Sequence, residues 1–115
     1  MIFNKTRKQP IIDEESICRS FISKATGLMF RKKPDYGLVF LFDKARKVSL
    51  TMYFVFFPID VLFLDQQMRV VDMKKDFRPF TNYTPIADCN IVVELPTGLL
   101  GKTKIGDSIA ITGLK

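Results

Sequence analysis

The sequence predicts a mainly β protein of one domain, built as an antiparallel β-sandwich or a closed barrel with one clear helix and one short helix. From Gly37 onward, stretches rich in β-branched and aromatic residues follow one another. The linkers between the first of these stretches are short and polar, as antiparallel hairpins require. The chain has 115 residues, which is near the usual size of one domain. We therefore expect a single domain over residues 1–115 with one hydrophobic core.

The first expected elements are an edge strand and the clear helix. Residues 1–12 suggest an edge strand that ends near Pro10. Residues 13–26 predict the helix, because their apolar side chains recur at helical spacing along one stripe. Asp13 is a suitable N-cap, and Gly27 is placed to end the helix.

The remaining strands are predicted from composition and alternation, with a long loop at 74–85 between the fourth and the fifth. They comprise residues 37–42, 48–57, 59–65, 68–73, 86–95 and 108–113. Pro58 interrupts an apolar run and predicts a bend or bulge there. The segment 96–107 is expected to hold the short helix or a turn.

The sequence contains no histidine and two cysteines, Cys18 and Cys89, which do not form a CxxC pair. Without histidine there is no imidazole to act as a general base or to bind zinc. Cys18 lies on the apolar stripe of the expected helix, which favours a buried, unreactive thiol. We expect no disulfide, no cofactor, no metal site and no turnover of generic ester, phosphoester or glycoside substrates.

The apolar run at 52–64 is interrupted by Pro58 and Asp60. It is also shorter than the roughly 18 residues that a membrane-spanning helix needs. The N-terminal MIFNKTRKQP lacks the apolar segment and the cleavage pattern of a signal peptide. We therefore expect a cytoplasmic protein without a membrane span, present as a monomer.

Three stretches occur in a distinctive order: GLMFR at 27–31, TMYFVFFPIDVLFLD at 51–65, and VVELPTG at 92–98, followed by Gly-Asp at 106–107. Together they resemble the family called domain of unknown function 192, over residues from about 25 to 112. The resemblance implies a compact, mainly β fold with no established activity. The charged residues inside these motifs are Arg31, Asp60, Glu94 and Asp107.

Asp60 is the most unusual of these residues, because it lies within an apolar run. In an extended strand it shares a face with Leu62 and Leu64, so its charge must be compensated. Arg31 is one expected partner, since a guanidinium suits a carboxylate in geometry and charge. Backbone amides near the Pro58 bend are the other expected partner of Asp60.

Three uses of these residues stay open. Arg31 could form a structural ion pair with Asp60 or Glu94, which is the interpretation we favour. Arg31 could instead bind a small anionic ligand that a carboxylate orients. In the third, Asp60 and Glu94 serve as acid and base in a hydrolase or transferase. Asp107 is expected to stabilise a turn after Gly106.

The net charge is +6, and residues 1–34 hold eight Lys or Arg against three acids. This basic segment and the loop after residue 73 could contact nucleic-acid phosphates, with loop aromatics stacking on bases. The candidates are Lys5, Arg7, Lys8, Lys32, Lys33, Lys74, Lys75 and Arg78. The glycine- and lysine-containing segment 97–106 lacks the spacing of a nucleotide-binding phosphate loop.

The function that these patterns favour is a ligand- or partner-binding module without catalytic activity. Its ligand would be a small anion or a protein partner. The alternative is a nucleic-acid-binding accessory domain that uses the basic N-terminal third.

Overall fold

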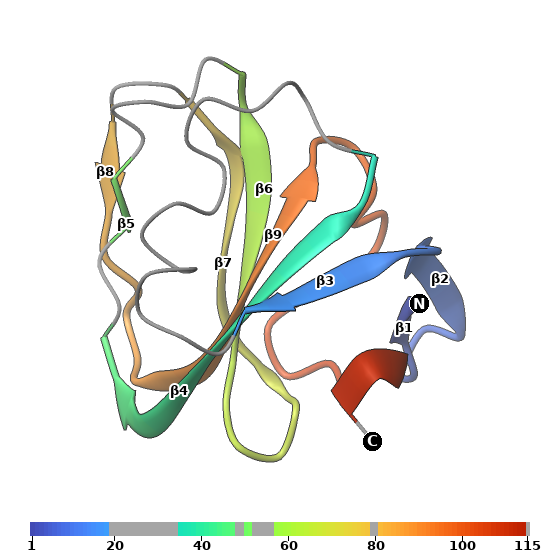
Figure 1. Cartoon of the computed structure of the whole chain (residues 1–115), viewed down its shortest axis with the longest axis horizontal. Coiled ribbons are helices and arrows are strands. Elements are labelled where there is room, and N and C mark those ends of the chain that lie inside the picture. Colours follow the sequence, from blue (N-terminus) through green and yellow to red (C-terminus); the bar gives the residue numbers. More distant parts are fainter. Residues whose placement is uncertain (19–34, 48–49, 52–56, 79–80, 115) are drawn as a thin grey trace.

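The computed structural model describes residues 1–18, 35–47, 50–51, 57–78 and 81–114 (Figure 1). Its elements are β1 (Ile2–Asn4), β2 (Gln9–Ile12), β3 (Glu15–Cys18), β4 (Gly37–Arg46), β5 (Leu50–Thr51), β6 (Ile59–Leu64), β7 (Val70–Phe77), β8 (Asn82–Tyr83), β9 (Cys89–Pro96), β10 (Ile109–Ile111) and the 3-10 turn η1 (Thr112–Leu114). The protein is therefore mainly β, as predicted.

The centre of the fold is a five-stranded sheet in the order β3-β4-β9-β6-β7. A three-stranded sheet, β10-β1-β2, and the short β5-β8 pair lie on opposite sides of it (Figure 1). The pairs are antiparallel except for β3 and β4, which run parallel. This pair corrects the expectation of a purely antiparallel arrangement. A parallel pair needs a crossover of a dozen or more residues, which the chain between Cys18 and Gly37 is long enough to provide.

Two apolar clusters cover the two faces of the central sheet. The first cluster joins it to the three-stranded sheet and contains Ile2, Ile11, Val39, Leu62, Leu64, Val70, Ile91, Val93, Leu95, Leu100, Ile109 and Ile111. The second cluster contains Leu38, Phe40, Ile59, Val61, Phe63, Phe77, Cys89 and Val92. Every residue of β6 is buried, because its strand lies between β9 and β7 with a cluster on each face.

The helix predicted at 13–26 is wrong for its first part, where residues 15–18 form β3. Ile17 packs against the first cluster and Cys18 against the second, so the two neighbours point to opposite faces. Adjacent apolar residues suit a helical stripe as well as a strand with two buried faces, and pairing with β4 decides between them. Residues 19–26 of the prediction lie outside the described residues.

Of the alternatives predicted for residues 96–107, the turn is observed rather than the short helix, and the described strands do not close into a barrel. Within the described ranges, residues 97–107 form successive turns, and the only helical segment is η1. The backbones at Gly98 and Gly106 have φ angles of 88° and 97°, which a right-handed helix cannot contain. In the described part of the chain, β3 and β7 are the two edges of the central sheet and do not pair with each other.

The remaining strands predicted from residue 37 onward agree with the observed ones to within a few residues, apart from two extensions. β4 continues to Arg46, and β7 continues to Phe77 into the stretch expected to be a loop. The single edge strand expected over residues 1–12 is wrong: the segment forms a hairpin of β1 and β2, in which β1 lies between β10 and β2, and β8 lies in the stretch expected to be a loop. Of the strand expected at 48–57, residues 50–51 form β5, and 48–49 and 52–56 lie outside the described residues. No helix among the described residues has the length and apolar character needed to cross a membrane. Cys89 is buried, whereas Cys18, which was predicted to be buried, is only partly buried.

Candidate functional site

Asp60 is an anchor for the backbone of two neighbouring segments. Only 4% of the residue is exposed. Its Oδ1 accepts a hydrogen bond of 2.8 Å from the amide of Asp76, and its Oδ2 accepts one of 3.0 Å from the amide of Gly98. Backbone amides were one of the two predicted means of compensation. They come from Asp76 and Gly98 rather than from the Pro58 bend.

The two amides that bind Asp60 belong to residues with left-handed backbones, at φ 53° for Asp76 and 88° for Gly98. In β7, residues 75 and 76 form a bulge opposite Asp60, because Ile59 pairs with Phe77 while Val61 pairs with Lys74. The carboxylate therefore holds a bulge on one side and the turn after β9 on the other.

Glu94 lies on the opposite face of the sheet from Asp60. In the β6–β9 register Asp60 pairs with Leu95, whereas Glu94 pairs with Val61 of the second cluster. Directly paired residues share a face and successive residues alternate, so the carboxyls of Asp60 and Glu94 point apart. The structure therefore contradicts the hypothesis that these two residues act together as acid and base.

The Glu94 side chain is only partly accessible, and burial raises the pKa of its carboxyl to about 7. No described residue donates a hydrogen bond to this carboxyl. Arg31, the partner expected for Glu94 or Asp60, lies outside the described residues. An ion pair of Arg31 with either carboxylate thus stays a prediction.

Asp107 is the centre of a buried polar network that the sequence did not reveal. It accepts a bidentate pair of hydrogen bonds from Arg7, at 3.0 and 3.2 Å, and one of 3.0 Å from Asn4 Nδ2. The amide of Lys104 donates a further bond, also 3.0 Å, to the same carboxylate. The predicted turn role is confirmed by this bond. Asn4 also donates to Thr103 Oγ1 at 2.9 Å, which fixes the loop before Asp107.

Of the predicted nucleic-acid residues that the structure describes, the two arginines form ion pairs with acids. The Arg7 guanidinium is engaged by Asp107, and that of Arg78 pairs with Asp76 at 2.7 Å. The Lys74 ammonium lies 5.6 Å from the centre of the Tyr83 ring. Lys5 and Lys8 are exposed on the hairpin between β1 and β2. Lys32 and Lys33 lie outside the described residues.

Lys75 takes part in a different cluster, formed with Lys102 and Lys104. The three exposed lysines line a depression of about 550 Å³ together with Met73, Gly101, Thr103 and Ile105. No acidic side chain lines it among the described residues. A neighbouring depression of about 460 Å³ shares Lys75 and Gly101 and reaches Asp60. The sequence indicated only Lys75, because the other two lysines lie more than twenty positions further along the chain.

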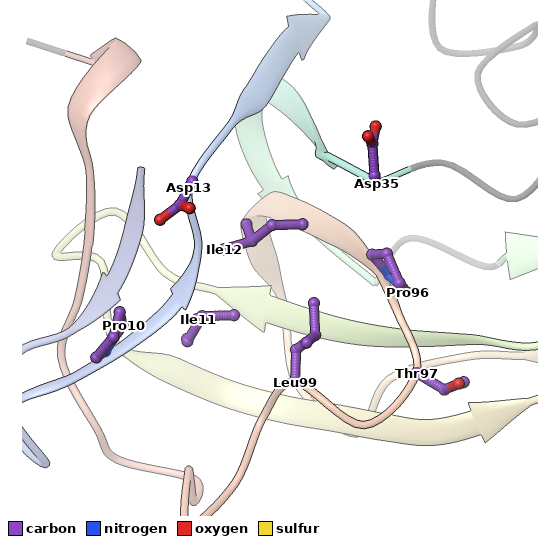
Figure 2. A pocket seen from close by; sticks show the side chains of 8 residues that line it. All are labelled: Pro10, Ile11, Ile12, Asp13, Asp35, Pro96, Thr97 and Leu99. Carbon is purple, nitrogen blue, oxygen red and sulfur yellow. The ribbon is translucent and has the colours of Figure 1, made fainter.

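A third hollow, of about 600 Å³, lies where β2 leads into β3 and where β9 ends (Figure 2). Its lining combines apolar side chains with two carboxylates. The residues are Pro10, Ile11, Ile12, Asp13, Asp35, Pro96, Thr97 and Leu99. No Lys or Arg of the described chain lines it. The described residues contain no group of three or more His, Cys, Asp or Glu that could hold a metal ion.

Comparison with known proteins identifies related chains of similar length. The profile of the family DUF192, described as an uncharacterised ACR, matches residues 2–111. The UPF0127 protein PH1112 of Pyrococcus horikoshii is 38% identical over 113 residues, which cover 95% of this chain and 96% of that protein. A UPF0127 protein of Thermococcus sibiricus is 33% identical over 113 residues, covering 95% and 73%.

Among solved structures, a protein of unknown function from Novosphingobium aromaticivorans superposes with a TM-score of 0.77 at 24% identity. The match covers 84% of this chain and 74% of that protein, and it shows a shared fold. The family match begins at residue 2, so it includes the three N-terminal strands that precede the motifs recognised in the sequence.

Proposed function

This chain belongs to the uncharacterised DUF192 family, and we propose that it is a binding module for a small anionic ligand. The ligand binds in the depression lined by Lys75, Lys102 and Lys104. The observation that carries the proposal is the gathering of three ammonium groups around one hollow whose described lining contains no acid. Within the described chain, none of these lysines forms a salt bridge.

The backbone that carries the lysines is held by the two buried aspartates. Lys75 lies in the β7 bulge that Asp60 fixes through the amide of Asp76. Asp107 accepts the amide of Lys104 directly. Because these segments are ordered before a ligand arrives, less conformational entropy is lost on binding.

The chemistry of the lining favours an anion that carries a phosphate or carboxylate group. Lysine binds phosphate as a point charge with three donors. Met73 and Ile105 add apolar surface, and 56% of Ile105 is exposed. A ligand with a small apolar part beside its anionic group would contact both.

The test is a calorimetric titration of the protein with pyrophosphate at low ionic strength. We expect saturable binding that weakens as salt is added, because the contacts are exposed and electrostatic. Replacing Lys75, Lys102 and Lys104 by Gln should abolish it. The matched control replaces the exposed Lys5, Lys8 and Lys44 by Gln, which removes the same charge elsewhere. If both triple variants lose pyrophosphate affinity equally, binding depends only on the net charge of the protein, and the proposed site is refuted.

The alternative anion is single-stranded nucleic acid, whose phosphates the three exposed lysines of the depression would also suit. Phosphates would contact the lysines, and a base could stack on an aromatic ring. Titrations with single-stranded and duplex oligonucleotides at two salt concentrations distinguish the two ligands. The affinity of the protein for an oligonucleotide falls by roughly one power of the salt concentration for each phosphate that the protein contacts.

We also propose a sandwich-like arrangement of the sheets and a cytoplasmic location, both of which the sequence predicted. The two apolar clusters, one on each face of the central sheet, support a layered, sandwich-like arrangement. The low cysteine content of the chain, two residues in 115, supports a cytoplasmic location.

A further inference from the structure

We propose that the hollow shown in Figure 2 binds a small organic ammonium ion with an apolar body. This site is distinct from the lysine-lined depression, and the described linings of the two hollows have no residue in common. The proposed occupant is of opposite charge to the anion proposed above.

The floor of the hollow is an edge of the first cluster, where buried Ile11 is flanked by the partly accessible Ile12 and Leu99. Ile11 belongs to that cluster, and Ile12 and Leu99 pack against it. Figure 2 shows these three side chains converging from β2 and from the turn after β9. Pro10 and Pro96 complete the apolar lining. An alkyl or ring group laid on this floor would remove apolar surface from water on both molecules.

The charged groups of the described lining are all negative. Asp13 lies at the start of the path from β2 into β3, and Asp35 lies before β4, so the carboxylates come from two separate segments (Figure 2). Both residues are exposed, and no described residue forms a salt bridge with either. In a chain of net charge +6, this local excess of negative charge favours a cation. Thr97 adds a hydroxyl to the lining.

The size of the hollow agrees with a small molecule. Its volume of about 600 Å³ lies within the range of about 300 to 1,000 Å³ that ligand sites usually have. Apolar lining with a few polar groups that set orientation is the usual composition of such sites. The proposed orientation places the apolar body against Ile11, Ile12 and Leu99 and the ammonium group at the rim where Asp13 and Asp35 lie.

The experiment uses hexylammonium chloride as the probe and follows methyl resonances by NMR. We expect saturable shifts of the Ile11, Ile12 and Leu99 methyl groups. Hexanol tests the apolar contribution alone, and hexanoate tests the opposite charge. Hexylammonium should bind more tightly than either. Equal affinity for hexanol, tighter binding of hexanoate, or shifts confined to other methyl groups would overturn the proposal.

The double variant Asp13→Asn with Asp35→Asn removes both carboxylate charges and keeps the shape of the two side chains. Because exposed ion pairs contribute modestly, we expect affinity for hexylammonium to fall about three- to tenfold, with its salt dependence largely lost. The matched control is Asp43→Asn with Asp88→Asn, which neutralises two exposed aspartates outside the hollow. If both double variants weaken binding equally, the carboxylates at the hollow do not recognise the cation.

Discussion

Arg7 and Asp107 join the two ends of the chain through a bidentate ion pair across 100 positions of sequence. Nε donates to Oδ2 at 3.0 Å and Nη2 donates to Oδ1 at 3.2 Å. The carboxylate is nearly buried, with 5% of the side chain exposed, whereas 37% of the Arg7 side chain is exposed. The pair ties the hairpin after β1 to the loop before β10.

Replacing Arg7 by Met should lower the free energy of unfolding by about 3 kcal/mol, because it leaves a buried carboxylate without its cation. Breaking a buried ion pair usually costs about 3 to 5 kcal/mol, and we take the lower end because Arg7 is partly exposed. Denaturation in urea measures the change. The double variant with Asp107→Asn should cost less than the sum of the single variants. Additive effects would show that the two side chains are not coupled.

The same pair predicts a loss of stability in acid. The hydrogen bonds from Arg7 are the largest cause that lowers the pKa of Asp107, from 3.8 to about 2. A carboxylate whose pKa is lower in the folded state stabilises the fold above its ordinary pKa, and this stabilisation is lost as the pH falls toward 2. The stability difference between the parent and Asp107→Asn should therefore shrink between pH 4 and pH 2. A difference that stays constant over that interval would contradict this.

Asp60→Ala should destabilise the protein by about 2 to 4 kcal/mol, because the backbone amides of Asp76 and Gly98 lose the buried carboxylate that accepts their hydrogen bonds. It should also weaken pyrophosphate binding, since the bulge that carries Lys75 loses its support. The control is Asp76→Gly, which keeps the donating amide and suits the left-handed backbone at φ 53°. That variant should unfold at nearly the same urea concentration as the parent. If Asp60→Ala is equally stable, Asp60 is not an anchor.

Glu94→Gln should stabilise the protein at pH 8. The pKa of Glu94 is raised by burial to about 7, so the folded state favours the neutral acid. The stability that neutral Glu94 gives the folded state is complete below the ordinary pKa of 4.5 and is lost as the pH rises to about 7. Allowing for partial exposure, we expect a gain of about 2 kcal/mol at pH 8 and none at pH 4.

The Glu94→Gln measurement also tests the predicted ion pair with Arg31. A carboxylate paired with a guanidinium is stabilised in its charged form, so its neutralisation would destabilise the fold at pH 8. In that case Arg31→Met should cause a similar loss, and the double variant should cost less than the sum. Stabilisation by Glu94→Gln together with an unchanged Arg31→Met variant would exclude the pair.

Tyr83 should ionise at a higher pH than an ordinary tyrosine. Its hydroxyl donates a hydrogen bond of 2.6 Å to Asp72, which, with burial, raises the pKa of Tyr83 to about 12. The neutral phenol therefore stabilises the fold up to pH 10, and this contribution is lost as the pH rises from 10 to 12. Ultraviolet absorbance titration should show one late transition that Tyr83→Phe removes and Asp72→Asn moves to lower pH. Tyr36→Phe is the control.

The sequence determined the β character and most strand positions, because alternation and β-branched composition are local properties. It also determined that Asp60 shares a face with Leu62 and Leu64 and must be compensated, since that follows from the geometry of one strand. The family resemblance was visible for the same reason, as its motifs are continuous segments.

The tertiary structure decided every feature that depends on partners distant in sequence. Residues 15–18 became a strand because β4 pairs with them, although their apolar pattern also suited a helix. The β6–β9 register placed Glu94 and Asp60 on opposite faces, which no single-strand pattern could decide. Long-range contacts also gave Arg7 its partner and brought Lys102 and Lys104 to Lys75. Charge and hydropathy along the chain do not specify such contacts, because folding selects them by burying apolar surface and pairing buried polar groups together.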